Sequence, residues 1–182
     1  MKLLEAERMA LFFRQWFTRP TTLNDQLTTT ETKATGAEAQ FLKGLAFEGG
    51  KGVLQDYAQA AHWYAQAAEQ NHNLAQLNLA MLYGQGQGVE RDEAKSLMWL
   101  TRAAQLGNAA AQYRLGVHKH LACRKGLVGA VTESRIEALK WVRLSAVQGY
   151  RPAESACEFV ALGMTREEVA ESALRVSEFI AV

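Results

Sequence analysis

The sequence predicts an all-α protein built as an α/α solenoid. It comprises three helix pairs of 36, 36 and 42 residues and a divergent C-terminal capping helix pair. Three observations predict this fold. The 182 residues include 30 alanines and only two prolines, a composition that favours closely packed helices. A motif recurs at a period of 36 residues, and each recurrence divides into two helical segments with capping residues at matching positions.

The composition also narrows the class of partner and the compartment. A formal net charge of +1 removes a general electrostatic reason to expect nucleic acid as the partner. No apolar run approaches the roughly 18 residues that a membrane span needs. The only cysteines are Cys123 and Cys157, and the first residues lack a signal-peptide pattern. These features favour a cytoplasmic protein.

Residues 1–17 are predicted to form an amphipathic helix, and the threonine-rich residues 18–36 a linker. Because a large aromatic face needs to be covered, we expect the helix to fold back as a cap on the first repeat or into the concave groove. The alternatives are self-association through residues 3–17, docking to a partner protein, and binding to a membrane surface. The apolar face consists of Met9, Phe12, Phe13, Trp16 and Phe17.

The repeats span residues 37–151, as units of about 37–72, 73–108 and 109–151. Matching glutamines lie 36 residues apart, whereas the spacing between the last two tryptophans is 42. The third unit therefore carries six extra residues between its two helices. The marker residues are the glutamines Gln40, Gln76 and Gln112 and the tryptophans Trp63, Trp99 and Trp141.

The second helix of each unit is predicted from its two ends. It opens on a residue whose short side chain can accept a first-turn amide, and it closes on one that tolerates the left-handed conformation. Its interior holds small residues and a tryptophan, so neighbouring helices can approach closely. Ser134 followed by Glu137 also predicts a capping box. The opening residues are Asp56, Asp92 and Ser134, and the closing residues are Asn71, Gly107 and Gly149.

Residues 152–182 are predicted to cap the array. The repeat pattern restarts after Pro152 and then decays, and Gly163 ends one helix. Thr165 and Glu168 predict a capping box that opens another helix. Terminal repeats need a polar outer face, so we expect this helix pair to close the solenoid. The apolar stripe predicted for the last helix is Val169, Ala173, Val176 and Ile180.

These motifs make the chain resemble the Sel-one-like repeat (SLR) family, a relative of the tetratricopeptide repeat. The likeness rests on A-E-A-Q-F-L-K-G, then G-K-G-V, then D-Y-A-Q-A-A-H-W-Y-A-Q-A-A-E-Q-N, and covers residues 37–151. Ala80 replaces the glycine found at Gly44 and Gly116, and Lys119 replaces an aromatic residue. The resemblance implies a right-handed solenoid that presents a concave surface to other proteins.

The resemblance also implies which positions of the first helices face inward. An apolar stripe with polar edges suits a peptide or an amphipathic helix, although an aromatic residue there can equally pack between helices. Glu48, Gln85 and His120 have no evident packing role, so we expect them at the surface. The concave face implied by the resemblance is Phe41, Leu45, Glu48, Leu77, Met81, Gln85, Tyr113, Val117 and His120.

The inserted segment of the third unit holds the densest positive cluster of the chain, expected to be a solvated basic loop. An acidic partner segment is the functional alternative, with Arg124 as the carboxylate-binding group. His118, His120 and Cys123 are also metal-ligand types, but no fourth ligand follows at a recognisable spacing. We therefore predict no metal and no cofactor. The basic cluster is His118, Lys119, Arg124 and Lys125.

No enzyme motif is present: the chain lacks a nucleophile elbow, a zinc-protease helix motif and a phosphate-binding loop. The sequence thus predicts a non-enzymatic scaffold that binds a peptide or protein on its concave face. One alternative is a small-ligand or hydrolase-like (β-lactam-related) pocket, which would be closed and contain His118, His120 or Cys123. The other is self-association through the N-terminal helix.

Overall fold

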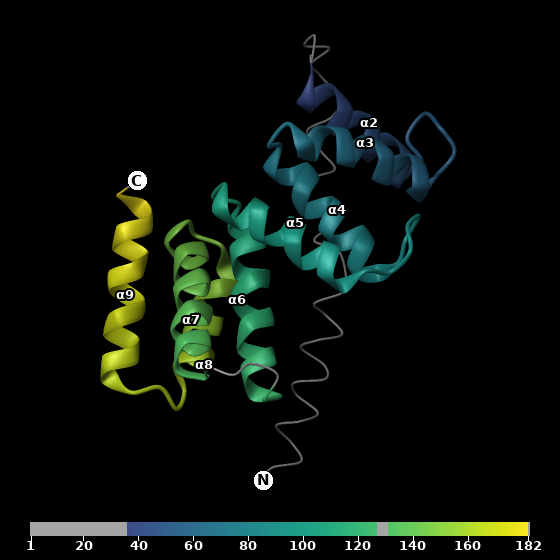
Figure 1. Ribbon diagram of the computed structural model, residues 1–182. Helices are drawn as coiled ribbons and strands as arrows, with labels where there is room; N and C mark the ends of the chain where they lie inside the picture. Colours follow the sequence, from purple (N-terminus) through teal and green to yellow (C-terminus); the bar gives the residue numbers. More distant parts are fainter. Residues whose placement is uncertain (1–35, 127–130, 182) are drawn as a thin grey trace. The chain divides into compact units, whose positions relative to one another are not determined.

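The computed structural model describes residues 36–126 and 131–181, within one compact unit, Thr35–Val182 (Figure 1). The predicted helix at 1–17 and nearly all of the linker lie outside the described residues. Every regular element in the described part is an α-helix, and none is long and apolar enough to cross a membrane. The helices are α2 (Ala37–Gly49), α3 (Tyr57–Glu69), α4 (Asn73–Gln85), α5 (Glu93–Gln105), α6 (Ala109–Arg124), α7 (Val131–Val147), α8 (Arg151–Ala161) and α9 (Arg166–Ile180).

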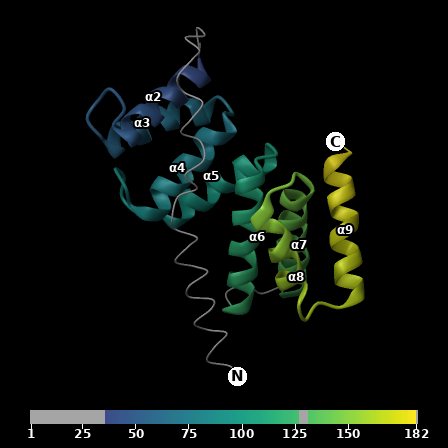
Figure 2. The same ribbon diagram turned by 180° about the vertical axis from the view of Figure 1, so that it is seen from behind.

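Consecutive helices pack as three pairs, which confirms the predicted repeat architecture. α2 packs on α3, α4 on α5, and α6 on α7. The second helix of each pair also contacts the helix that follows it, so that α3 touches α4, α5 touches α6, and α7 touches α8. The opposite views in Figure 1 and Figure 2 show this succession. Each pair thereby buries an apolar face that it could not bury alone.

The ends of the second helices are formed as predicted in the first two repeats. The Asp56 carboxylate accepts hydrogen bonds from the backbone of Ala58 and Gln59, at 2.8 and 3.0 Å. Asp92 accepts one from the backbone of Lys95 at 2.9 Å. The residues that close the second helices all have positive φ, with values of 61° at Asn71, 82° at Gly107 and 77° at Gly149.

One glutamine makes a hydrogen bond across each boundary between repeats: Gln76 joins the second repeat to the first, and Gln112 joins the third to the second. The side-chain amide of Gln76 donates to the carbonyl oxygen of Ala68 at 3.0 Å, and that of Gln112 donates to Ala104 at 3.1 Å. Both glutamines are 1% exposed. Each of these carbonyls also accepts a backbone hydrogen bond, from Asn71 at Ala68 and from Gly107 at Ala104, so each glutamine adds a second donor at the end of the preceding helix. The sequence marked the period with these residues but did not predict this role.

The predicted start of α7 is wrong. As described, α7 begins at Val131, so Ser134 is its fourth residue and not its N-cap. Glu137 does not form a capping box with Ser134. It pairs instead with Lys140 at 3.4 Å and with Arg175 at 3.2 Å. An acidic residue in the first turn, Glu133, favours the earlier start because it interacts well with the helix dipole.

The six inserted residues lengthen two helices instead of forming a loop. α6 has 16 residues and α7 has 17, against 13 in both α4 and α5. The prediction of a basic loop is therefore wrong for His118, Lys119 and Arg124, which are helical. Their segment contains no glycine or proline, so nothing interrupts the helix before Gly126, which has a φ of 68°.

The C-terminal helices do not form the predicted pair. α8 and α9 both pack on α7, and the contact between α8 and α9 is slight at most. Figure 1 and Figure 2 both show α9 beside α7. The predicted capping box is confirmed: the Thr165 backbone donates to the Glu168 carboxylate at 2.7 Å, and the Glu168 backbone donates to the Thr165 hydroxyl at 3.2 Å.

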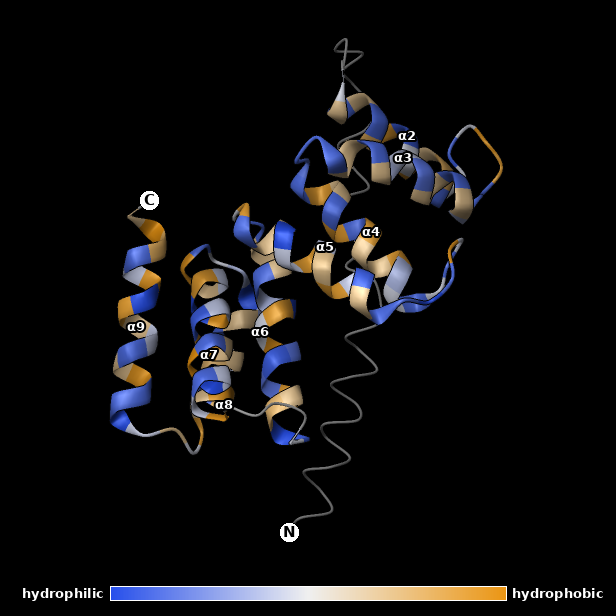
Figure 3. Ribbon diagram, viewed as in Figure 1, coloured by the Kyte–Doolittle hydropathy of each residue, from blue (hydrophilic) through white to orange (hydrophobic). Residues whose placement is uncertain are grey.

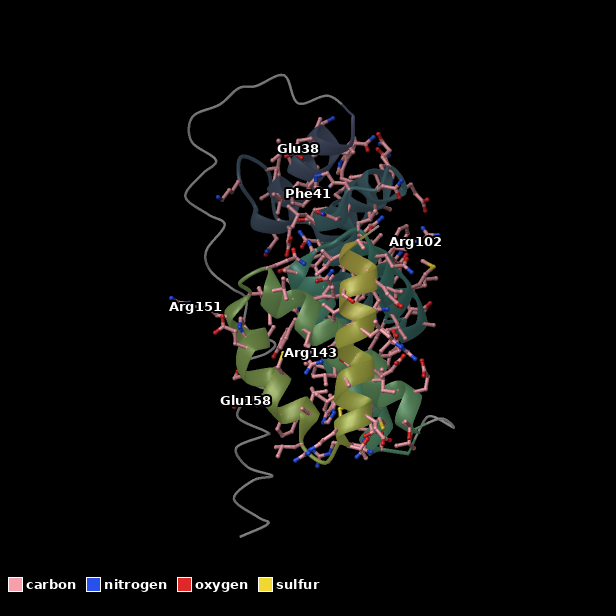
Figure 4. The ribbon with its side chains drawn as sticks, turned by 90° about the vertical axis from the view of Figure 1, so that its left-hand side faces the viewer. Glu38, Phe41, Arg102, Arg143, Arg151 and Glu158 are labelled. Atoms are coloured by element: carbon pink, nitrogen blue, oxygen red, sulfur yellow. The ribbon has the colours of Figure 1, made fainter. Side chains whose placement is uncertain are left out.

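The inward face of α9 agrees with the predicted apolar stripe only in part: Val169 and Val176 are partly buried, and Val176 packs on the core. Glu168 and Ser172 are its buried residues, whereas Ala173 is exposed and Ile180 is 59% exposed. Figure 3 shows polar and apolar bands alternating along α9. Arginines of α7 and α9 set this orientation. Arg143 donates to the carbonyl of Val169 at 2.8 Å, and Figure 4 shows it beside α9. Ion pairs also join α7 to α9: Arg135 pairs with Glu168, and Arg175 pairs with Glu133 and Glu137. Arg175 pairs in addition with Glu171 within α9.

Candidate protein-binding face

Three apolar side chains at equivalent repeat positions remain partly exposed on the first helices. They are Leu45 on α2, Met81 on α4 and Val117 on α6, each 36 residues from the next. Because the repeats are equivalent, these positions lie on the same side of the array. We call the three residues the first-helix strip. Gln85, one turn beyond Met81, is exposed as predicted and adds an amide at the edge of the strip.

Three other members of the predicted concave face pack between helices. Phe41, Leu77 and Tyr113 are 8%, 7% and 3% exposed. The Phe41 ring stacks on His72 at 4.5 Å between ring centroids, and the Tyr113 ring lies 5.5 Å from Tyr150. Burial raises the pKa of Tyr113. These side chains therefore join successive first helices, which is the packing alternative that the sequence left open.

Glu48 has a structural role that the sequence did not reveal. Its carboxylate accepts a hydrogen bond from the hydroxyl of Tyr64 at 2.6 Å, and the Tyr64 side chain is 0% exposed. Its backbone carbonyl accepts another from the Gln55 amide at 2.8 Å. A buried tyrosine hydroxyl needs such a partner. The expectation that Glu48 has no packing role is therefore wrong.

His120 is not a surface residue, which corrects a second expectation. It is 9% exposed, and its ring packs edge-on against Phe159 of α8 at 5.3 Å. The lengthened α6 carries His120 beneath α8, which explains the burial. Burial, and then the charges of Arg124 and Arg135, lower the pKa of His120 below its ordinary value of 6.5. Its Nε2 atom has no hydrogen-bond partner among the described residues.

His120 should make the protein less stable in mild acid. Since its pKa is lowered in the folded state, the unfolded chain takes up a proton first, and stability is lost as the pH falls through about 6.5. We expect His120→Leu to show a smaller fall in the unfolding free energy than wild type between about pH 7.5 and pH 5.5. Urea denaturation at both pH values measures it. Equal falls in the two proteins would contradict this assignment.

The basic cluster does not form a joint site in the described structure. His118 lies 3.8 Å from Glu93, Lys119 is half-buried, and Arg124 and Lys125 are exposed. Across residues 36–126 and 131–181, no group of three or more His, Cys, Asp and Glu side chains is arranged to hold a metal ion. The thiol of Cys123 lies 3.6 Å from the backbone oxygen of Val131.

A surface pocket lies at the loop between α4 and α5. Asp92 lines it while also capping α5, and the backbone hydrogen bond from Lys95 lowers the pKa of this carboxyl. This pocket contains none of His118, His120 and Cys123, so it is not the closed pocket of the small-ligand alternative. Its lining residues are Tyr83, Val89, Glu90, Arg91, Asp92 and Lys95.

The helix pairs stack in succession, carry equivalent N-caps at Asp56 and Asp92, and are joined by glutamine hydrogen bonds between repeats. These features define an α/α helical-repeat protein. More particularly, the chain belongs to the Sel1 repeat family, whose model matches residues 37–72, 73–108 and 109–150. These bounds agree with the predicted units to within one residue. This family is typically non-catalytic.

Several solved structures resemble the chain, and two of them are Sel1 repeat or SLR-fold proteins. The crystal structure of a Sel1 repeat protein from Oxalobacter formigenes is 26% identical, with a TM-score of 0.58, and the match covers 86% of this chain and 57% of that one. The structure of c5321, a protective antigen present in uropathogenic Escherichia coli strains displaying an SLR fold, is 27% identical, with a TM-score of 0.42 and coverage of 76% and 38%. The chain thus spans little more than half of the first structure. A comparison with curated proteins finds no match.

Proposed function

We propose that this protein is a non-enzymatic scaffold that binds a peptide or protein along the first-helix strip. One observation carries the proposal. Leu45, Met81 and Val117 stay partly exposed, whereas the other apolar members of the concave face are buried between helices. A Sel1 repeat solenoid is consistent with a protein-interaction scaffold.

The chemistry of the strip fits an extended or helical apolar segment. Its residues come from three successive first helices, so a partner would contact them in a row. Met81 lies at the centre, and its unbranched side chain adapts to differently shaped apolar surfaces. Partial exposure leaves apolar area that a partner can remove from water, at about 25 cal/mol per Å². Gln85 offers a donor and an acceptor at the edge, which can fix the register of the partner.

The test replaces Met81 with glutamate. We expect Met81→Glu to weaken partner binding at least tenfold, because a carboxylate would be desolvated at the centre of an apolar contact. Met98→Glu is the matched control, since Met98 is 42% exposed on α5, a second helix. Partners are captured from native lysate by wild type and both variants and quantified by mass spectrometry. Equal recovery by all three proteins would overturn the proposal.

Self-association through residues 3–17 falls outside the described residues and stays a prediction. A cytoplasmic location also stays a proposal, which cell fractionation tests. The small-ligand alternative is not favoured, because the surface pocket between α4 and α5 contains none of His118, His120 and Cys123.

A further inference from the structure

The side of the first repeat that faces away from the second has a distinct set of residues. In the second and third repeats, the equivalent side is buried against the preceding second helix. In the first repeat, no described helix occupies that position. We call this side the leading face and define it by Gln40, Lys43, Val53 and Trp63. Comparison with the two later repeats shows what such a face binds.

The glutamine of the leading face is already oriented for a partner. In the third repeat, the Gln112 side-chain oxygen accepts from Gln148 at 2.7 Å while its nitrogen donates across the repeat boundary to Ala104. Gln40 makes the same first contact, since its oxygen accepts from Gln70 at 2.6 Å. Its nitrogen is therefore directed as in Gln112, but no acceptor for it lies among the described residues.

The apolar positions of the leading face are more exposed than their equivalents. Lys43 stands where Leu79 and Leu115 are each 1% exposed, and its ammonium group lies over the Trp63 ring at 4.3 Å from the centroid. Trp63 itself is only partly buried, whereas the two later tryptophans are 6% and 5% exposed. The indole nitrogen of Trp63 is itself buried, yet it has no hydrogen-bond partner in the described part of the chain.

The loop of the first repeat is open in the same way. A Cβ added at Gly88 in the second repeat would lie 2.1 Å from the backbone of Tyr57, because that loop packs on the preceding second helix. At the equivalent Gly52, an added Cβ meets nothing within 4 Å. Val53, the next residue, is 41% exposed, whereas its equivalent Val89 packs on the core. Among the described residues, Gln40, Gly52 and Val53 therefore lack the contacts that their equivalents make with a preceding helix or with the core.

We propose that the leading face docks an amphipathic helix from a partner protein, with the C-terminal end of that helix at Gln40 and its first turn at the loop that holds Val53. The two occupants seen on equivalent faces define its chemistry. Both α3 and α5 end in adjacent alanines, Ala67-Ala68 and Ala103-Ala104, which are at most 1% exposed and let the tryptophan approach. Both offer a backbone carbonyl to the glutamine.

The chain's own N-terminal segment fits this description poorly. Residues 1–17 contain Ala6 and Ala10 but no two adjacent small residues, and bulky aromatic side chains fill the rest of the predicted apolar face. A helix from a partner protein is therefore the better occupant. This surface is separate from the first-helix strip, so the two proposals can succeed or fail independently.

The test uses a helix-stabilised synthetic peptide with the sequence of residues 56–72, the segment that fills the equivalent face in the second repeat. Full-length protein labelled with ¹⁵N is titrated with this peptide, and the indole and side-chain amide signals are followed. We expect shifts at Trp63 and Gln40, and smaller ones at Trp99 and Trp141. A peptide with leucines in place of Ala67 and Ala68 should not bind, because the larger side chains hold the helices apart.

Two variants with opposite expected effects sharpen the test. Gln40→Ala should weaken peptide binding about fivefold through one lost hydrogen bond, whereas the matched control Gln85→Ala should not. Lys43→Leu should strengthen binding about tenfold, because leucine is the residue buried at the two equivalent positions. Absence of a Trp63 shift, or weaker binding by Lys43→Leu, would overturn the proposal. A Trp63 shift on concentrating the protein alone would point to a second copy and would also overturn it.

Discussion

Replacing Gly88 with alanine is expected to destabilise the protein by about 3 kcal/mol, or a melting temperature lower by roughly 10 °C. The added Cβ would lie 2.1 Å from the carbonyl carbon of Tyr57 and 2.4 Å from the backbone nitrogen of Ala58. Both atoms belong to the backbone, so no flexible side chain can yield. Gly88 also has a φ of 69°, where a side chain adds strain. Thermal unfolding followed by circular dichroism measures the effect.

Gly52→Ala is the matched control for this prediction. Gly52 occupies the same loop position in the first repeat and has a φ of 74°, but an added Cβ there has no neighbour within 4 Å in the described structure. Only the conformational cost of about 1–2 kcal/mol remains. If Gly52→Ala and Gly88→Ala destabilise the protein equally, the loop of the second repeat does not pack on α3 as described.

Trp141→Ala is expected to destabilise the protein by about 3–5 kcal/mol. Trp141 is 5% exposed and packs in one cluster with Ala103, Ala104 and Leu144. Its ring also meets Phe179 of α9 edge-on, at 5.5 Å between centroids. The substitution therefore leaves a cavity and removes an aromatic contact that holds α9 on α7. Urea denaturation should show the loss, and hydrogen exchange should show α9 amides exchanging faster than those of α3.

Trp63→Ala, the equivalent substitution in the first repeat, shows whether the loss of stability depends on how deeply the tryptophan is buried. Trp63 occupies the equivalent position but is only partly buried, so Trp63→Ala should cost clearly less than Trp141→Ala. Its effect should also leave hydrogen exchange in α9 unchanged. Equal losses of unfolding free energy in the two variants would mean that the leading face is covered in the free protein.

Much of the fold could be predicted because its determinants are local. A helix cap depends on contacts two or three residues away, so Asp56, Asp92 and Thr165 could be identified from neighbouring residues alone. The period could be read because matching glutamines and tryptophans recur along the chain. The length of the third unit was also correct, but the sequence placed its extra residues in a loop. Helix continuation through His118 and Lys119 decided otherwise.

The candidate site was less predictable because exposure depends on neighbours that are distant in sequence. Phe41 and Tyr113 match the inward-facing pattern, yet His72 and Tyr150 cover their rings. Glu48 looked free because its partner, the buried hydroxyl of Tyr64, lies on another helix. Sequence spacing indicates which side of a helix a residue occupies, but it does not indicate what lies against that side.

The sequence by itself determined the Sel1 repeat, its period, its caps and the order of its helices, because contacts within a few residues specify each of them. The tertiary structure decided three things: that His120 is buried beneath α8, that α9 packs on α7 with Glu168 and Ser172 buried beside Val176 and Phe179, and that no described helix covers the leading face of the first repeat. The physical reason is the same in each case. A side chain becomes buried only when a second surface packs against it, and a repeat motif describes the first surface but not the second.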